Sequence, residues 1–496
     1  MKKYLIGLLV IGLAVSSVSA QKVFDFNRTC QLAYNNILEL KLVQGQQLLD
    51  KAKQQNPNNL IPVYLESYID FLVLFFNEDA LVYQQRKSAI SSRIDLLQEG
   101  PISSPFYRYC LAQAHFHKAA IAIKFNENWS AGWAFRKSFQ YIKENKKQHP
   151  DFVLNNLMDG SLQAVVSTIP EGYTFLAGIL GMQGSLTQGM QQVKHFLSSN
   201  DAWAKLHHQE AVFMYTYLLF YIENKKDEAL AFIKSESLDF VNHHLLTYMA
   251  VNLSLNNKQP DAARTLIANR NKSTDYLYTP VWEYEAGIAC LFHLELEEAI
   301  GHFEKFVKEF KGSFYMKDAL LKLSWCYYLK GNIAAATAVR EQIRTRGVAT
   351  SDADKQALKD VQNNYWPNVV LLKARMLNDG GYDQEALKVL AGTSASSFAK
   401  EEEKLEYTYR VARIYDDLKQ YDKAIKTYEI AIALGTGKPA YYAARAALQT
   451  GNILEKQGKK QLAIVYYEKC LQMKGHEYKN SLDQKAKSGI ARCKGM

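Results

Sequence analysis

The sequence predicts an all-α protein, built as a superhelical array of antiparallel helix pairs. Alanines recur at steps of 34, 36, 37, 50, 38 and 39 residues through the C-terminal three-fifths of the chain, at Ala229, Ala263, Ala299, Ala336, Ala386, Ala424 and Ala463. The residue twelve positions before each alanine is small in the last five cases, and the residue four positions after it is large and mostly apolar. Two helices cross closely only where both side chains are small, and a large residue one turn later fills the gap beside the crossing. Such pairs bury their apolar faces only against neighbouring pairs, so they form an array.

The composition of the chain agrees with this fold class. Only 10 prolines and 26 glycines occur in 496 residues, and both residue types weaken helix interiors. The net charge is +10, and lysine-rich segments such as 143–147 and 456–460 stand where helices are expected to end. Lysines there oppose the helix dipole, which is the simpler explanation, and attraction to acidic polymers or an anionic membrane surface is the alternative. Nucleic acid is not expected as a partner, because no basic segment carries interleaved aromatic residues.

Residues 1–20 are expected to be a secretory signal peptide. Lys2 and Lys3 precede an apolar run over 4–15, and Val18-Ser19-Ala20 fits a small-x-small cleavage signal. The run is too short to span a bilayer, which makes a permanent anchor the weaker alternative. No cysteine follows the cleavage point directly, so a lipid anchor is not expected. Cleavage between Ala20 and Gln21 would leave an exported, soluble protein of the periplasm or cell envelope, with no transmembrane segment in the mature chain.

The C-terminal units share small and aromatic residues at matching positions. The clearest sets are Ala412, Tyr415, Tyr421, Ala424, Tyr428 and Ala431, then Gly451, Ala463, Tyr467 and Cys470, and then Gly287, Ala299, Phe303 and Phe306. Through these residues, the segment 205–475 resembles the tetratricopeptide repeat family, which implies helical repeats that bind other proteins. Two positions depart from the pattern, where Ser254 replaces a large residue and Arg340 replaces an aromatic one. We assign 201–476 to repeats of this kind and 477–496 to a C-terminal capping helix.

The N-terminal region, 21–200, is predicted to be helical but less regular. Residues 32–53 and 112–145 each suit a helix pair, and 64–76 is apolar on all sides, as a buried helix would be. Glycines between 160 and 189 predict a tight turn between two apolar helices in close contact. Ile169-Pro170 and Leu180-Gly181-x-x-Gly184 in this segment resemble the tetratricopeptide repeat protein 39 family. That resemblance implies a helical-repeat adaptor with no established catalytic residues.

Two further features concern the joints of the array. The long step between Ala336 and Ala386 contains an insertion over 345–366, expected to be a long loop or a lengthened helix, either functional or tolerated. The six cysteines are widely scattered, and buried free thiols are the default expectation. An oxidising compartment would permit disulfides, and Cys470 with Cys493 is the pair that could clamp the last unit to the terminal helix.

No catalytic residue, cofactor site or metal site is predicted. The chain lacks a Gly-x-Ser-x-Gly motif, and Gly435-Thr436-Gly437-Lys438-Pro439 lacks the spacing and the hydroxyl of a phosphate-binding loop. The histidine pairs 115/117, 207/208 and 243/244 do not share a helix face, so structural or surface roles are expected. We therefore expect a non-catalytic interaction scaffold of the cell envelope. The alternatives are a glycan-binding helical-repeat protein of the nutrient-uptake type and an enzyme whose active site is assembled from distant helices.

The expected binding site is the concave groove of the array, and the expected partner is a protein or peptide. In such arrays the first helix of each pair lines the groove, and the residue after the small crossing position points into it, as does the residue three further on. The first row is Trp325, Arg375, Arg413 and Asn452, and the second is Tyr328, Asn378, Asp416 and Glu455. The arginines could bind a carboxylate of an extended peptide bidentately. The alternative is a solvated groove whose charges pair among themselves.

Overall fold

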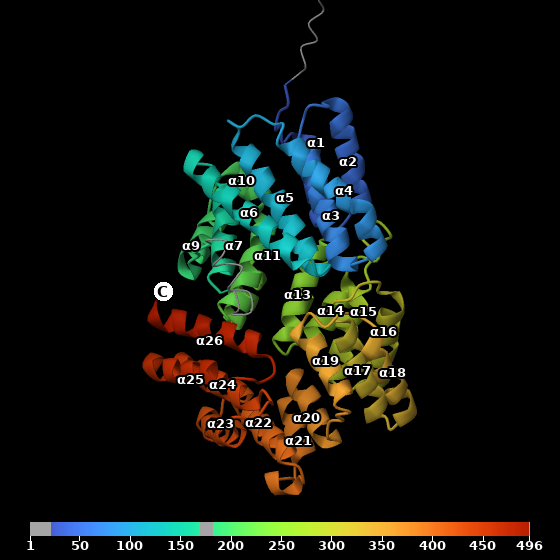
Figure 1. The fold of residues 1–496 in the computed structure, drawn as a ribbon, viewed down its shortest axis with the longest axis vertical. Helices are drawn as coiled ribbons and strands as arrows, with labels where there is room; N and C mark the ends of the chain where they lie inside the picture. Colours follow the sequence, from blue (N-terminus) through green and yellow to red (C-terminus); the bar gives the residue numbers. More distant parts are fainter. Residues whose placement is uncertain (1–20, 169–181, 496) are drawn as a thin grey trace, which may run out of the picture.

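The computed structural model describes residues 21–168 and 182–495 (Figure 1). Helices joined by short turns make up this part of the chain, which contains no β-strand and one isolated bridge between Val23 and Asn59. The all-α class that the sequence predicts is confirmed. The helices that precede the regular pairs are α1 (Arg28–Leu38), α2 (Leu42–Gln55), α3 (Ile61–Asn77), α4 (Ala80–Leu97), α5 (Pro105–Lys124), α6 (Asn128–Gln148), α7 (Leu154–Val166), α9 (Leu186–Leu197), α10 (Ala202–Leu206), α11 (His208–Tyr217) and the π-helical turn η1 (Leu218–Ile222).

The first remaining helix forms a pair with α11 and η1, and the others follow one another as antiparallel pairs, with one extra helix and a terminal helix. They are α12 (Lys226–Ser235), α13 (His244–Asn256), α14 (Pro260–Asn269), α15 (Val281–Phe292), α16 (Leu296–Glu309), α17 (Met316–Leu329), α18 (Ile333–Thr345), α19 (Asp352–Gln362), α20 (Val369–Asp379), α21 (Asp383–Leu390), the short turn η2 (Ala395–Ser397), α22 (Glu401–Asp417), α23 (Tyr421–Gly435), α24 (Tyr442–Lys456), α25 (Lys460–Gln472) and α26 (Lys479–Lys494). Each helix packs mainly against its neighbours in sequence, as an array requires.

The predicted crossing positions of the array are confirmed. The seven alanines from Ala229 to Ala463 are each 0% exposed, and each lies in the second helix of its pair. A methyl group added at Gly287 would lie 2.8 Å from the Phe303 ring, and one added at Gly451 would lie 2.6 Å from the Tyr467 ring. The large residue four positions after the alanine therefore occupies the space that the small residue on the first helix leaves free.

The same device operates in the N-terminal region. A methyl group at Gly160 in α7 would lie 2.7 Å from the Gly189 carbonyl in α9, and one at Gly189 would lie 2.5 Å from the Gly160 carbonyl. The two backbones touch, as the glycines of this segment predict. Ile169-Pro170 and Leu180-Gly181 lie outside the described residues, as does the expected signal peptide.

The insertion over 345–366 contains the separate helix α19, which packs on α17 and α18. Arg340 occupies the position where the repeat pattern has an aromatic residue, and its guanidinium donates to the carbonyls of Asp360 (3.1 Å) and Tyr365 (2.8 Å). In return, the Asp354 carboxylate accepts the backbone N–H groups of Tyr315 and Asp318 at the start of α17. The residue that departs from the repeat pattern thus holds the end of the inserted helix.

The C-terminal end of the array returns to its middle, where α26 lies beside α11 and η1 (Figure 1). Ser488 in α26 donates to the Ile222 carbonyl, and Arg492 donates to the Glu223 carbonyl at 2.6 Å. The last carbonyls of a helix have no partner within it, and these two donors bind them. The closure brings α12–α14 to face α20–α26, and we call the region where these helices meet the lumen.

Two further observations bear on the sequence-based expectations. None of the described helices is long and apolar enough to cross a membrane. All six cysteines are free thiols, Cys470 and Cys493 included. Burial raises the pKa of the Cys470 thiol to about 12, so it packs as a small apolar group.

Candidate functional site

The first residues of the two predicted rows, in α17, pack against other side chains of the array. The Trp325 side chain in α17 is only 4% exposed, and the Arg375 guanidinium lies 5.0 Å from its ring centroid. Tyr328 packs against Trp366 of the insertion, with ring centroids 4.8 Å apart. These contacts join α17 to α20 and to the segment that follows α19.

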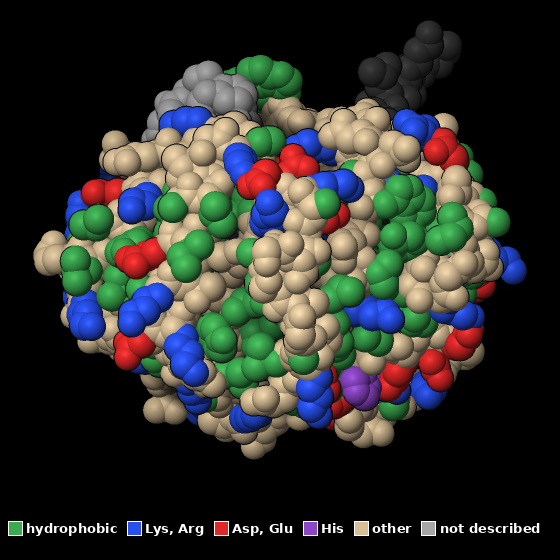
Figure 2. Space-filling view, turned by 90° about the horizontal axis from the view of Figure 1, so that it is seen from below, with side chains coloured by type: hydrophobic (Ala, Val, Ile, Leu, Met, Phe, Trp, Pro, Cys, Tyr) green, Lys and Arg blue, Asp and Glu red, His purple; other side chains and the backbone are tan. Residues whose placement is uncertain are grey.

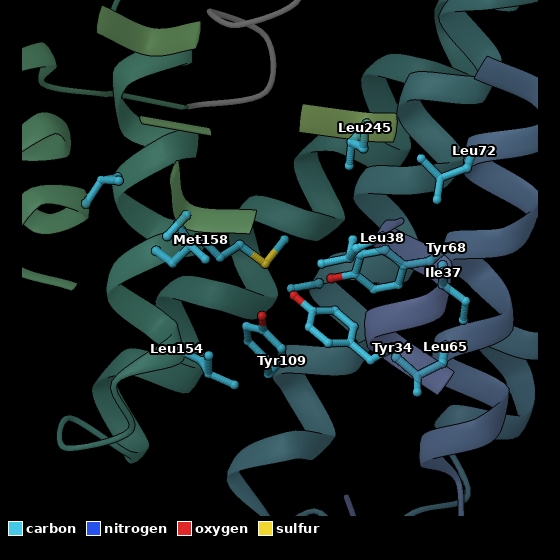
Figure 3. Packing of buried hydrophobic residues seen from close by; sticks show 14 of the residues in the cluster. Tyr34, Ile37, Leu38, Leu65, Tyr68, Leu72, Tyr109, Leu154, Met158 and Leu245 are labelled. Carbon is cyan, nitrogen blue, oxygen red and sulfur yellow. The ribbon is translucent and has the colours of Figure 1, made fainter. Parts of the chain in front are cut away.

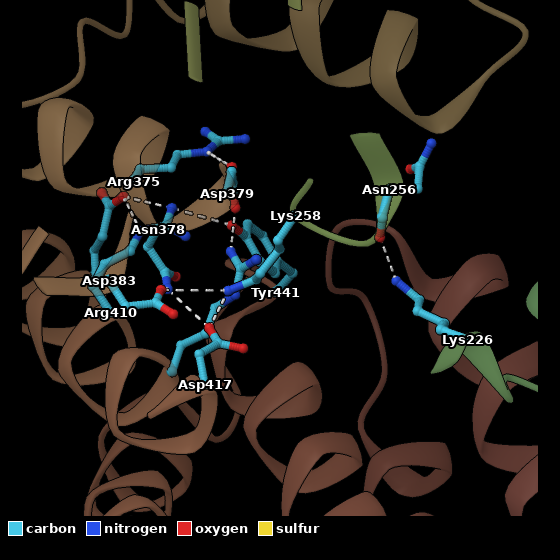
Figure 4. Close-up of polar contacts among 12 residues, drawn as sticks. Lys226, Asn256, Lys258, Arg375, Asn378, Asp379, Asp383, Arg410, Asp417 and Tyr441 are labelled. Carbon is cyan, nitrogen blue, oxygen red and sulfur yellow. Dashed lines mark hydrogen bonds and ion pairs between the residues drawn. The ribbon is translucent and has the colours of Figure 1, made fainter. Parts of the chain in front are cut away.

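The middle of the groove is a charged network, shown in Figure 4. The Asp379 carboxylate accepts a hydrogen bond from the Arg413 guanidinium, and it lies 3.6 Å from Nε of Arg375. Burial alone would raise the pKa of the Asp379 carboxyl, but the surrounding arginines hold that pKa well below its usual value. The Asn378 amide donates to Asp383 (2.6 Å) and to Asp417 (2.8 Å).

The last residues of the two predicted rows, in α24, hold the terminal helix α26 in place. Tyr467 donates to Asn452 at 2.9 Å and to Glu455 at 2.5 Å. Arg492 of α26 binds both oxygens of Glu455, each at 2.8 Å. Asp416 accepts the Tyr428 hydroxyl at 3.2 Å, and burial raises the pKa of the Asp416 carboxyl to about 6. The predicted residues therefore bond mainly to other side chains of the array, such as Asp379, Tyr467 and Arg492, and their binding of a partner stays a prediction.

Cations from outside the predicted rows complete the lumen. Lys258, at the turn between α13 and α14, reaches across to Asp417 and lies 3.8 Å from Asp383. Lys226 in α12 donates to the Asn256 carbonyl at 2.7 Å. Arg445 in α24 and Lys485 in α26 are also half-buried. We call Lys226, Lys258, Arg375, Arg413, Arg445 and Lys485 the basic lumen.

These cations face one another closely enough to change their acidity. Burial, followed by the charges of Lys485, Arg445, Arg413 and Lys258, lowers the pKa of Lys226 to about 7. Burial and Arg445 lower the pKa of Lys485 to about 8. Within the described ranges, Lys226, Arg445 and Lys485 have no carboxylate within ion-pair distance, whereas Lys258, Arg375 and Arg413 share Asp379, Asp383 and Asp417. The lumen therefore holds an excess of positive charge.

The outer surface has no comparable concentration of charge on the face that Figure 2 shows. Lysine, arginine, aspartate and glutamate side chains are interspersed with hydrophobic ones on that face. The sequence pattern did not single out Lys226, Lys258, Arg445 or Lys485, because they meet only through the curvature and closure of the array. Arg413 and Asp379 did carry a signal, since they stand 34 residues apart, close to one repeat.

Two histidines of the predicted pairs, His117 and His244, are buried against aromatic rings. His117 is hydrogen-bonded to Ser67 at 2.9 Å and stacks on Phe71. His244 stacks on Tyr276 with ring centroids 3.7 Å apart. Burial lowers the pKa of His117 to about 3 and that of His244 to about 4, so both are neutral. No cluster of three or more potential metal ligands occurs in the part of the chain that the structure describes.

Comparison with known proteins identifies the repeats at the C-terminal end. A family model described as the tetratricopeptide repeat matches residues 405–434 and 444–477, which are the pairs α22/α23 and α24/α25. A search of curated proteins finds no match. Among solved structures, the chain is similar to one titled "Crystal structure of APC/C hetero-tetramer Cut9-Hcn1", at 11% identity and a TM-score of 0.26 over 94% of this chain and 96% of that one. That TM-score is too low for the likeness to support an argument about fold or function. The family match and the helix pairs together show that this all-α array contains tetratricopeptide repeats.

Proposed function

We propose that the protein is a non-catalytic scaffold that binds an acidic segment of a partner protein or peptide in the basic lumen. The observation that carries the proposal is the excess of positive charge on the inner helices. Tetratricopeptide repeats generally mediate protein binding, so the inner face is the expected place for a partner. The basic lumen adds the chemistry that the partner should have.

Carboxylates would relieve an unfavourable arrangement. Half-buried cations that face one another repel, and burial removes the water that would stabilise them. A carboxylate between Lys226, Arg445 and Lys485 would supply the missing opposite charge and accept charge-assisted hydrogen bonds. An extended acidic peptide would also present several carboxylates along the lumen.

The setting of this function is part of the same proposal. The 1–20 segment supports export and cleavage after Ala20, which would place the scaffold in the periplasm or the cell envelope. The likeness of the 159–190 segment to the tetratricopeptide repeat protein 39 family is in keeping with an adaptor role. Intracellular partners of that family would not be available to an exported protein.

The test measures binding of a short polyglutamate peptide by fluorescence polarisation. Arg375 and Arg413 are unsuitable positions for charge reversal, because Arg→Glu there would place new carboxylates beside Asp379. Lys226→Gln with Lys485→Gln removes charges that have no carboxylate partner among the described residues, so the fold should be retained. We expect this double variant to bind polyglutamate about tenfold more weakly.

The matched control is Lys234→Gln with Lys494→Gln, which changes the same helices by the same charge at exposed positions. It should bind as the wild type does. An equal loss of polyglutamate affinity in both double variants would mean that binding depends on net charge alone, and the proposal would be wrong. Capture of a stoichiometric protein from envelope extract would identify the partner, and retention on polysaccharide columns without one would favour the glycan-binding alternative.

A further inference from the structure

A cavity of about 870 Å³ lies between the N-terminal helices and the first regular pairs. Side chains from α3, α5, α7, α11, η1, α13, α15 and α17 line it, and most of them are aromatic or aliphatic. Tyr68, Tyr109, Leu72 and Met158, shown in Figure 3, belong to this wall. Small-molecule sites in proteins have about this size and apolar character, with a few polar groups that fix orientation.

Three of the acidic side chains on the wall are well satisfied. Glu78 pairs with Lys124 at 2.8 Å and accepts the backbone N–H groups of Ser313 and Phe314. Asp318 accepts the Tyr284 hydroxyl at 2.6 Å and pairs with Lys322. Glu210 accepts the hydroxyls of Tyr34 (2.6 Å) and Tyr68 (3.0 Å) and lies 3.4 Å from the Gln113 amide.

Glu285 is the exception. Its side chain lines the cavity in α15 and is only 4% exposed, yet among the described residues it accepts one side-chain hydrogen bond, from Asn252 at 3.2 Å. No cation from the described ranges lies within ion-pair distance of it. Burial raises the pKa of this carboxyl to about 7. A buried carboxylate with so few partners is unfavourable, and a positive group in the cavity would stabilise it.

Five tyrosines line the cavity together with this carboxyl. Tyr217, Tyr221, Tyr248, Tyr284 and Tyr315 all line the same cavity. Burial raises the pKa of each phenol, and the charge of Glu285 raises it further, so these rings lie within electrostatic reach of the carboxylate. Aromatic faces attract organic cations, and cages of such rings bind quaternary ammonium groups.

We propose that this cavity binds an apolar organic cation, an amine or quaternary ammonium compound with a hydrocarbon chain. The nitrogen would lie between Glu285 and the tyrosine rings, and the hydrocarbon would extend along the wall towards Leu72 and Met158. The opposite polarity is disfavoured, because an anionic amphiphile would place its charge on a wall whose cations, Lys124 and Lys322, are already paired. This site uses none of the residues of the basic lumen.

Three probes with the same hydrocarbon chain test the polarity of the site. Octyltrimethylammonium, octanol and octanoate are titrated separately into the full chain, below their aggregation concentrations, by isothermal calorimetry. The cation should bind about tenfold more tightly than octanol, and octanoate should bind most weakly. Equal binding of the three probes, tighter binding of octanoate, or no binding of the cation would each overturn the proposal.

Matched variants locate the site. Glu285→Gln keeps the size of the side chain and should weaken binding of the cation about tenfold while leaving octanol unchanged. Glu283→Gln is the control in the same helix, because Glu283 pairs with His302 and Lys305 and does not line the cavity. Ala120→Trp should fill part of the cavity and weaken all probes that bind. If Glu285→Gln kept the full preference for the cation, the assignment would be wrong.

Discussion

The Tyr467 ring is held between two glycines, which makes Gly451→Ala an informative substitution. A methyl group at Gly451 in α24 would lie 2.6 Å from Cε1 of the ring, and one at Gly489 in α26 would lie 2.5 Å from Cε2. The ring cannot move away from one helix without moving into the other, and its hydroxyl is fixed by Asn452 and Glu455. Overpacking of this kind costs about 1–3 kcal/mol, whereas Gly→Ala in a helix interior otherwise gains about 1 kcal/mol.

Gly301→Ala in α16 is the control, because a methyl group there meets nothing within 4 Å. Its stability shows the gain in helix propensity alone, so the difference between the two variants gives the cost of overpacking at Gly451. We expect Gly301→Ala to stabilise its helix and Gly451→Ala to be less stable than that variant by about 1–3 kcal/mol. In repeat arrays a few units can unfold while the rest stay folded. The assay is therefore amide hydrogen exchange measured in peptides from α24–α26, together with urea unfolding of the whole protein. If both variants gained the same stability, the Tyr467 ring would not be tightly packed against Gly451, and the reasoning would be wrong.

Three other outcomes are expected. Ala424→Leu and Ala463→Leu should each destabilise the C-terminal units by about 1–3 kcal/mol, and unchanged urea midpoints would contradict the crossing register. Arg340→Met removes the donor to two carbonyls near the end of α19, so amide exchange in that helix should become about tenfold faster, with unchanged exchange counting against an anchoring role. Mass spectrometry of the mature protein should find Gln21 at the N-terminus, and an intact Met1 would exclude cleavage.

The helix pairs could be predicted from the sequence because their packing is local. The small residue, the crossing alanine and the large residue after it, as in Gly451, Ala463 and Tyr467, lie within one repeat, and the Tyr467 ring packs directly on Gly451. Arg340 broke the pattern, and the structure explains why, since the inserted helix gives its guanidinium two carbonyls to bind. The sequence left open a long loop or a lengthened helix over 345–366, and periodicity alone did not show that a separate helix, α19, forms there.

The contents of the lumen could not be predicted in the same way. Lys258 and Asp417 are 159 residues apart, and they meet because small rotations between successive repeats add up to a closed turn. The predicted rows include Arg375 and Arg413, which belong to this network, but a list of side chains expected to point inward does not show which of them meet. The pairing of Arg375 with Asp379 follows an i, i+4 spacing within one helix, and it agrees with the alternative of charges that pair among themselves.

We expect stability and binding of an acidic peptide to respond to pH in opposite directions, because of the basic lumen. The folded-state pKa of Lys226 is about 7, well below its ordinary value of 10.5, because of burial and the nearby cations. Above about pH 7 the unfolded chain therefore binds more protons than the folded one, so the cost of this buried charge is largest below pH 7 and declines as pH rises towards 10.5. An acidic peptide needs the charged form, so its affinity should fall over the same range. Polyglutamate should thus bind the wild type more weakly at about pH 9 than at about pH 6, while the stability of the wild type relative to Lys226→Gln increases. Peptide affinity that stayed constant between these pH values in the wild type would show that the carboxylates bind elsewhere.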